Sequence, residues 1–239
     1  MEGKLFDVGF MFRAAPEILS RLPITLSITF VSLFFSLIIG FITAIARLRK
    51  IPVLTQIFNL YILYVRGTPL LIQIYMAYYG LPLVLLAINR EFGTDMNINS
   101  IAPIIFIYIA YSLNEGAYAS ETFRAAIESV DRGQAEAAHS IGMTPMQAMI
   151  RIIMPEALKV AVPNFGNNLL GLVKNTSLAF SISVLDIVAA AQVVGSRSFR
   201  FCEVYIVLSV IYWVACGLLT KVVQVVEKSL NAGERGIAA

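Results

Sequence analysis

One stretch of this chain constrains its fold more than any other: residues 22–46 contain no charged side chain between Arg21 and Arg47. A helix crosses a lipid bilayer with about 20 apolar residues. A soluble domain keeps its surface wetted with roughly 25% charged residues, whereas this chain has 14%, with 58% hydrophobic residues. The sequence therefore predicts a polytopic membrane protein. The same composition excludes a disordered chain, a collagen and a disulfide scaffold.

Hydropathy and proline positions predict an all-α membrane protein with five transmembrane helices in a single domain, 1–239. The second span contains Pro69 and Pro82 and is predicted to be long or broken. Charged residues return in the segment 124–159, which is predicted to leave the bilayer as a loop. The five spans are predicted at 22–46, 53–88, 98–123, 160–185 and 203–226.

Lys and Arg placement predicts the orientation, because cytoplasmic loops carry an excess of these residues. Arg47, Arg49 and Lys50 cluster after the first span, and the loop 124–159 and the tail add more. This arrangement places 10 basic residues on one side and 7 on the other. The N-terminus is therefore predicted outside, and the loop and the C-terminus inside.

The loop 124–159 contains residues that typically begin and end helices. Asp131 and Gly133 open a short helix that runs to Ile141, and Gly142 suits the left-handed position after a helix end. Thr144 and Gln147 have the spacing of a capping box around Pro145 at the first helical position. Two short helices joined at a glycine elbow are predicted, with an apolar surface of Ala137, Ala138, Ile141, Met143 and Met146. On these grounds alone, the elbow could pack under its own helix bundle or dock onto a partner.

The spacing within the elbow resembles the EAA motif of ABC-importer permeases. Glu136-Ala137-Ala138 is followed after three residues by Gly142, and after nine more by Ile152, Met154 and Pro155. Met154 in place of Leu is the only departure. The resemblance implies that the elbow docks onto an ATP-hydrolysing subunit. The docking residues would be Glu136, Ala137, Ala138, Ile141, Gly142, Met143 and Met146.

Three further stretches resemble the polar-amino-acid branch of that family: 66–71 (RGTPLL), Ala117-Tyr118 with Glu121 and Arg124, and 163–178, where Asn175 replaces the usual Asp. Asp186 falls where the branch keeps an acidic residue. The resemblance, which covers residues 22–227, implies a binding-protein-dependent permease fold in the inner membrane of a prokaryote. The implied partners are a second permease (a copy or a paralogue), two ATP-binding subunits that hold ATP-Mg, and an extracytoplasmic solute-binding protein.

Enzymatic chemistry has no support in the sequence. The Gly3-Lys4 pair lacks the rest of a P-loop, and His139 is the only histidine. No metal site or catalytic residue is predicted, and no cofactor is expected in this chain. Its energy is therefore expected from a partner or an ion gradient.

Polar residues at membrane depth are the candidates for substrate binding, because charges there are costly and usually face a partner or a wet cavity. Glu115 shares a helix face with Tyr111, Tyr118 and Thr122, and the family more often has a small or aromatic residue at its position. A carboxylate added to a substrate cavity suggests a cationic ligand. The other candidates are Glu121, Asn164, Asn168, Asp186, Arg66 and Asn59.

Each candidate also has a structural interpretation. Arg66 could bind the carbonyls freed before Pro69, Glu121 could pair with Arg124, and Asp186 could cap the following helix. Glu115 could be a hydrogen-bonded structural group, and the asparagines could join helices.

The resemblance thus implies a permease subunit of an ATP-driven importer for a polar amino acid, and Glu115 favours a basic one (arginine, lysine or histidine). The same machinery could carry glutamine or glutamate. The alternative from another class is a proton-coupled carrier, for which inverted repeats are expected.

Overall fold

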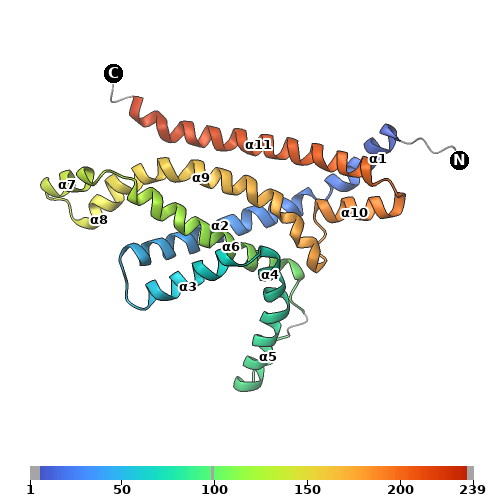
Figure 1. The fold of residues 1–239 in the computed structure, drawn as a ribbon, viewed down its shortest axis with the longest axis horizontal. Helices are drawn as coiled ribbons and strands as arrows, with labels where there is room; N and C mark the ends of the chain where they lie inside the picture. Colours follow the sequence, from blue (N-terminus) through green and yellow to red (C-terminus); the bar gives the residue numbers. More distant parts are fainter. Residues whose placement is uncertain (1–5, 98–99, 236–239) are drawn as a thin grey trace.

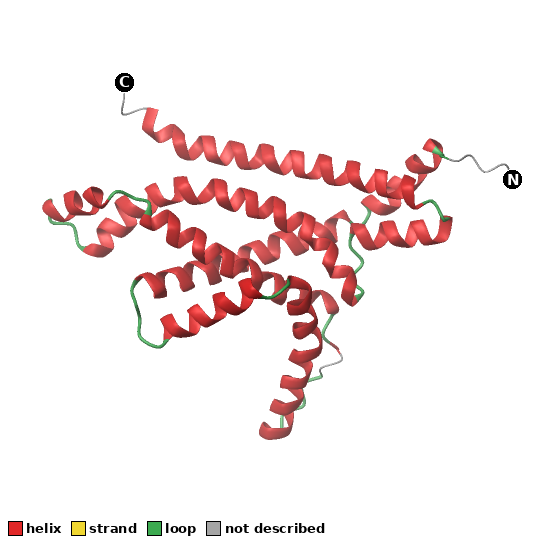
Figure 2. Ribbon diagram, viewed as in Figure 1, coloured by secondary structure: helices red, strands yellow, loops and turns green. Residues whose placement is uncertain are grey.

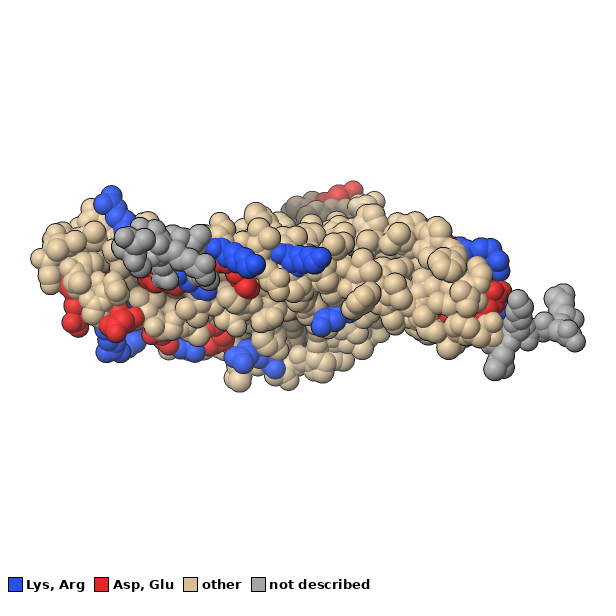
Figure 3. All heavy atoms as spheres, turned by 90° about the horizontal axis from the view of Figure 1, so that it is seen from above, with Lys and Arg blue, Asp and Glu red and all other residues tan. Residues whose placement is uncertain are grey.

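The computed structural model describes residues 6–97 and 100–235, and this part of the chain is helical throughout, with short connecting loops (Figure 2). The predicted all-α class is confirmed. The long helices run along one axis (Figure 1). On the face drawn in Figure 3, charged side chains are few. Lys4, both termini and residues 98–99 of the third predicted span lie outside the described residues.

The centre of the molecule is the pair α2 (Leu22–Leu48) and α6 (Pro103–Glu128). α2 buries a stripe of small and polar residues, the pattern of a helix whose solvent is lipid, and its exposed large side chains are Phe30, Phe34, Phe35, Ile38, Phe41 and Ile42. At Gly40, an added Cβ would lie 2.6 Å from the Cβ of Ala119. The stripe therefore lets the two backbones approach closely. Its members are Thr25, Thr29, Ser32, Ser36, Gly40 and Thr43.

The second predicted span, 53–88, is two separate helical segments. α3 (Leu54–Gly67) ends where Thr68 takes an extended conformation before Pro69, as the residue before a proline prefers. The chain resumes as α4 (Leu70–Tyr75), a π-helical turn η1 (Met76–Gly80) and α5 (Leu81–Phe92). Figure 1 shows α5 leaving the bundle crosswise to the long helices.

The fourth predicted span, 160–185, is also broken. α9 (Met154–Asn175) continues as a 3₁₀ segment, η4 (Thr176–Ile182), and then bends by 57° into α10 (Ile187–Ser198). α11 (Phe201–Arg235) extends beyond the predicted 203–226 at both ends. α9 lies between α6 and α11.

Length and composition identify three helical segments able to cross a membrane, Leu22–Leu48, Leu70–Phe92 and Phe201–Leu230, or four if the bent pair Pro145–Ile182 and Ile187–Ser198 counts as one span. α6 is not among them. Its sequence includes Asn114, Glu115 and Glu121, which lower its hydropathy, yet the protein itself buries much of this helix. The predicted number of five therefore does not follow from these criteria.

An apolar core lies at the end of the molecule where α1 (Val8–Leu19) packs on α10 and α11. Ala14 and Ile18 of α1 are buried there. The backbone N–H of Phe10 donates to Asp7 Oδ1 at 3.0 Å, which caps α1. This bond, with the nearby Arg13 and Arg200, holds the pKa of the Asp7 carboxyl below its ordinary value although burial opposes the shift.

The predicted elbow lies at the opposite end (Figure 1). α7 (Arg132–Ser140) begins at an Asp131 cap, and α8 (Pro145–Ala148) begins with a complete capping box of Thr144 and Gln147. Gly142 between them has φ +82°, as predicted for a left-handed turn. α6 continues to Glu128, however, and a π-helical segment η3 (Met149–Ile153) leads into α9 at Met154, so that both ends of the predicted loop 124–159 belong to long helices.

Candidate functional site

A polar cavity of about 380 Å³ lies where three segments meet: the break between α3 and α4, the middle of α6, and the second half of α9. The backbone break at Pro69 opens space beside α6, because the two helical segments diverge there. The lining residues are Thr68, Pro69, Leu70, Asn114, Glu115, Tyr118, Asn167, Asn168, Gly171 and Asn175.

Glu115 is the only charged residue that lines this cavity. Within the described part of the chain, its carboxylate accepts no hydrogen bond and forms no ion pair. Tyr118, one turn along α6, lies beside it and is 41% exposed. Of the predicted polar face, Tyr111 is buried and its hydroxyl donates to the carbonyl oxygen of Asn175 at 2.5 Å, while the Thr122 hydroxyl donates to the Tyr118 carbonyl at 3.3 Å.

The α9 wall carries three amide side chains, of which the sequence singled out only one as a candidate. Asn168 lines the cavity as predicted, together with Asn167 and Asn175. Asn164 does not line it, because its Nδ2 donates to the Val160 carbonyl of its own helix at 2.9 Å. The spacing 168, 171 and 175 follows one helical face, and this periodicity would have identified Asn175.

Arg66 of α3 does not line the cavity. Its guanidinium carbon is 5.5 Å from the centre of the Tyr118 ring, within the range of a cation–π contact. The predicted role of Arg66 at the helix break belongs to another residue, Gln73. Gln73 Nε2 donates to the carbonyl oxygens of Val65 and Thr68 at 2.8 and 3.1 Å.

Gln73 is a residue that the sequence interpretation missed. Its Oε1 accepts a hydrogen bond of 2.9 Å from Asn114 Nδ2, so that one amide joins the broken helix to α6 beside the cavity. Its position four residues after Pro69 could have indicated this role, because a proline frees backbone carbonyls that a nearby side-chain amide can bind.

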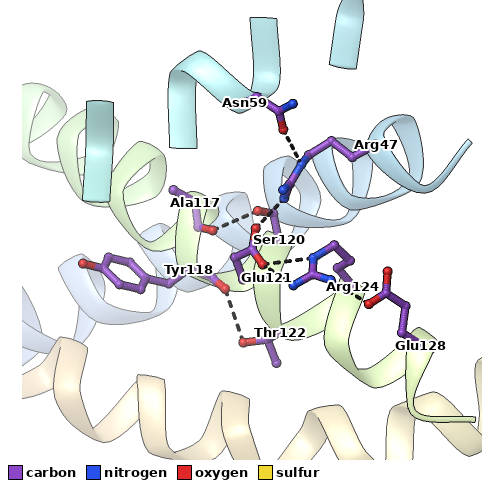
Figure 4. Close-up of polar contacts among 9 residues, drawn as sticks. All are labelled: Arg47, Asn59, Ala117, Tyr118, Ser120, Glu121, Thr122, Arg124 and Glu128. Carbon is purple, nitrogen blue, oxygen red and sulfur yellow. Dashed lines mark hydrogen bonds and ion pairs between the residues drawn. The ribbon is translucent and has the colours of Figure 1, made fainter. Parts of the chain in front are cut away.

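Glu121 and Asn59 were predicted to bind substrate, but the structure places both in a charged network outside the cavity (Figure 4). Glu121 Oε1 accepts from Arg47 at 2.5 Å, and its Oε2 accepts from Arg124 at 2.8 and 3.0 Å. Arg47 Nε also donates to Asn59 Oδ1 at 2.8 Å. The structure therefore has the pairing of Glu121 with Arg124, which the sequence analysis gave as the structural alternative.

Asp186 is likewise outside the cavity. It is fully buried at the start of α10, where its Oδ1 accepts from the backbone N–H of Ala189 at 2.9 Å. The structure thus has the helix cap that the sequence allowed as the alternative.

The elbow residues that were predicted to dock differ in how exposed they are. Ile141 and Met146 are 74% and 52% exposed, and Glu136, Ala137 and Gly142 are exposed as well. Met143 is half-buried. Ala138, which was predicted to dock, is buried against the chain's own helices.

Known proteins resemble nearly the whole chain. A family model described as "Binding-protein-dependent transport system inner membrane component" matches residues 20–231. The chain is 41% identical to the "Probable amino-acid ABC transporter permease protein PatM" of Vibrio harveyi, over 95% of this chain and 97% of the relative. It is 37% identical to the "L-cystine transport system permease protein TcyL" of Bacillus subtilis, over 98% and 95% of the two chains.

One solved structure, titled "Crystal structure of an amino acid ABC transporter with histidines", has a chain with the same fold. Its TM-score is 0.80 at 30% sequence identity, and the match covers 95% of this chain and all of that one.

Proposed function

The chain belongs to the family of binding-protein-dependent transport system inner membrane components and is the permease subunit of an amino-acid ABC importer; from this premise we propose that its cavity carries a polar, basic amino acid. Arginine, lysine and histidine are the candidates. The printed names of the relatives include an L-cystine permease.

The carboxylate of Glu115 is the observation that supports a basic substrate. It is half-buried at the cavity wall, where an unpaired charge is costly. A substrate ammonium or guanidinium group beside it supplies the missing charge, and charge-assisted hydrogen bonds are about twice as strong as neutral ones.

The other end of the substrate is an α-carboxylate, which needs donors. The amide groups of Asn167, Asn168 and Asn175 face it across the cavity from Glu115's helix. Arg66, whose guanidinium lies over the Tyr118 ring, is the cation proposed to attract this carboxylate. A ligand with a cation at one end and a carboxylate at the other fits such a cavity.

Glutamine is the second candidate, because the three amides on α9 suit a neutral amide side chain as well as a carboxylate. Glutamate fits less well, since it brings a second negative charge to Glu115. The proton-coupled carrier, the alternative from another class with Glu115 or Glu121 as the relay, does not fit a chain of this family.

The other subunits of the transporter are proposed from the family. A second permease subunit, two ATP-binding subunits and an extracytoplasmic solute-binding protein complete it. ATP-Mg binds the partner subunits. The exposed Ile141 and Met146 of the elbow fit a docking role in a groove on the ATPase, whereas the buried Ala138 supports the elbow from behind.

We further propose that the chain crosses the inner membrane of a prokaryote five times. The polar α6 then counts as a span because its neighbours cover it. The N-terminus lies outside, and the elbow and C-terminus lie in the cytoplasm.

Uptake by the reconstituted complex tests this proposal. The complex is placed in vesicles with the solute-binding protein and radiolabelled arginine, with and without internal ATP. Unlabelled lysine and histidine are expected to compete better than glutamine and glutamate. Uptake is expected to require internal ATP and to survive a protonophore, and better competition by glutamine than by lysine would overturn the basic-substrate proposal.

A further inference from the structure

One amide of the cavity wall, that of Asn175, has a fixed place relative to Glu115. The Tyr111 hydroxyl of α6 donates to the backbone carbonyl oxygen of Asn175 at 2.5 Å. Tyr111 and Glu115 are four residues apart on α6 and share one face of that helix, about 6 Å apart along its axis. The hydrogen bond therefore holds the end of α9 beside the part of α6 that carries Glu115.

The backbone around Asn175 is anchored in a buried core. Leu172, Thr176 and Ala179, which precede and follow it in the chain, are only 0–1% exposed. Leu172 and Ala179 share one apolar cluster with buried residues of α2, α4 and α6. Asn175 itself is exposed and lines the cavity. The packing thus sets the position of residue 175, whereas its side chain is presented to the cavity.

The charge of the cavity depends on which of its side chains are acids. Glu115 supplies one negative charge, and no Lys or Arg is among the lining residues. Lys174 is adjacent to Asn175 in the chain but does not line the cavity, as expected because successive residues of a helix do not face the same side. An amide and a carboxylate have nearly the same shape, so that an aspartate at position 175 would fit and would double the negative charge.

A second carboxylate would act strongly on the first because the cavity is small. A volume of about 380 Å³ corresponds to a cube with an edge of about 7 Å. For two charges about 7–10 Å apart at an effective dielectric constant of about 20, repulsion changes an equilibrium constant by roughly 15- to 60-fold. The second charge would also repel the α-carboxylate of an amino acid. A neutral side chain at position 175 therefore leaves Glu115 as the single charge that an incoming amino acid meets.

We propose that Asn175 is a specificity-determining residue of the importer: its neutral amide keeps the cavity at one negative charge, which matches an amino acid of net charge +1 such as arginine or lysine. Glu115 and Asn175 act as a pair, since a negative charge at either position is acceptable only when the other is neutral. The inference rests on the proposed transport function. The coupling between the two positions, however, does not depend on which amino acid is carried.

Four proteins test the pair: the parent, Glu115→Gln, Asn175→Asp, and the variant that combines both substitutions. Their cavities carry one, no, two and one negative charges, respectively. Each is assembled with the same ATP-binding subunits in vesicles, and uptake of arginine and of glutamine is measured at low concentration. The same solute-binding protein delivers the substrate to all four, so that differences in uptake belong to the permease.

Asn175→Asp is expected to have opposite effects in the two backgrounds. In the parent it lowers arginine uptake by roughly 15- to 60-fold, because two carboxylates then repel each other. In Glu115→Gln it raises arginine uptake, because it restores the single negative charge. The proposal requires the two factors to differ by at least about tenfold, and a smaller difference overturns it. A general folding defect lowers uptake in both backgrounds and cannot produce the gain.

Melting temperatures decide the matter if Asn175→Asp alone is too unstable for uptake. Repulsion acts on the empty cavity as well, so that this substitution is expected to lower the melting temperature in the parent and not in Glu115→Gln. Equal shifts in the two backgrounds overturn the proposal.

Asn164→Asp is the matched control, because it adds the same charge to α9 eleven residues earlier, outside the cavity. Its effect on uptake is expected to be the same factor with or without Glu115→Gln. If the parent carries glutamine but no arginine, the basic-substrate proposal is wrong. The pair is then tested with glutamine, whose loss of uptake on Asn175→Asp is still expected to be at least about tenfold larger in the parent than in Glu115→Gln.

Discussion

Replacing Glu115 by glutamine removes one charge from the cavity and leaves its shape almost unchanged. The amide keeps one oxygen acceptor and nearly the same volume, so the helix packing of α6 should persist. Arginine and lysine uptake is expected to weaken, because their cationic group loses its counter-charge. Uptake of neutral glutamine should fall less, or rise, because no desolvated carboxylate then opposes it.

The expected size follows from the environment of the carboxylate. Glu115 has no hydrogen-bond or ionic partner in the described part of the chain, so the substrate supplies the whole interaction. A hydrogen bond to a charged group contributes about 1.5–3 kcal/mol. At 1.36 kcal/mol for each factor of ten, this corresponds to a loss of about 10- to 150-fold in the apparent affinity for arginine.

The assay compares concentration dependences of arginine and glutamine uptake in vesicles with equal amounts of purified complex. Asn164→Ala is the control, since Asn164 bonds to its own helix and does not line the cavity. Its uptake of both substrates should match the parent. Equal losses of arginine and glutamine uptake in Glu115→Gln would mean that the carboxylate is structural, and the basic-substrate proposal would be withdrawn.

Four other outcomes are expected. Gly142→Val should leave the complex assembled but lower uptake and ATPase stimulation together, because a β-branched residue at φ +82° strains the elbow by about 1–3 kcal/mol; normal values of both would contradict this. Gly40→Val should lower the melting temperature of the purified protein, since a Cβ would lie 2.6 Å from Ala119, whereas Gly67→Ala, with open space around it, should not. Gln73→Leu should also lower it, because the Val65 and Thr68 carbonyls and the Asn114 amide lose their partner. Reporter fusions should give an external N-terminus and a cytoplasmic C-terminus, and cytoplasmic signals from both would contradict five spans.

Local backbone chemistry was the most predictable part of this molecule. The Thr144–Gln147 capping box, the Asp131 cap and the left-handed Gly142 all form as the sequence indicates. Each depends on residues within a few positions, and the side chains involved have few other ways to satisfy the helix end. The first span was also predictable, because a long uncharged segment in lipid forms a helix, which satisfies its own backbone hydrogen bonds.

The partners of the polar side chains were less predictable, because they depend on which helices become neighbours. Glu121 lies six residues from Glu115 on α6, about 1.7 turns at 3.6 residues per turn, and faces α2, where Arg47 neutralises it. Asn164 differs from Asn168 by one turn and still misses the cavity. A sequence gives the face of a helix but not what covers that face, so that neither assignment could be made before the packing was known.

Under the proposed five-span topology, the polar residues of α6 account for its absence from the helices that hydropathy selects. A helix in contact with lipid must be apolar, and α2 and α11 are. A helix in the centre of the bundle can hold Asn114, Glu115 and Glu121 because protein groups and the cavity, not lipid, surround them. A helix that lines the proposed substrate cavity is therefore expected to be less hydrophobic than its neighbours. For a permease of this kind, the least hydrophobic long helix is the first place to search for the substrate.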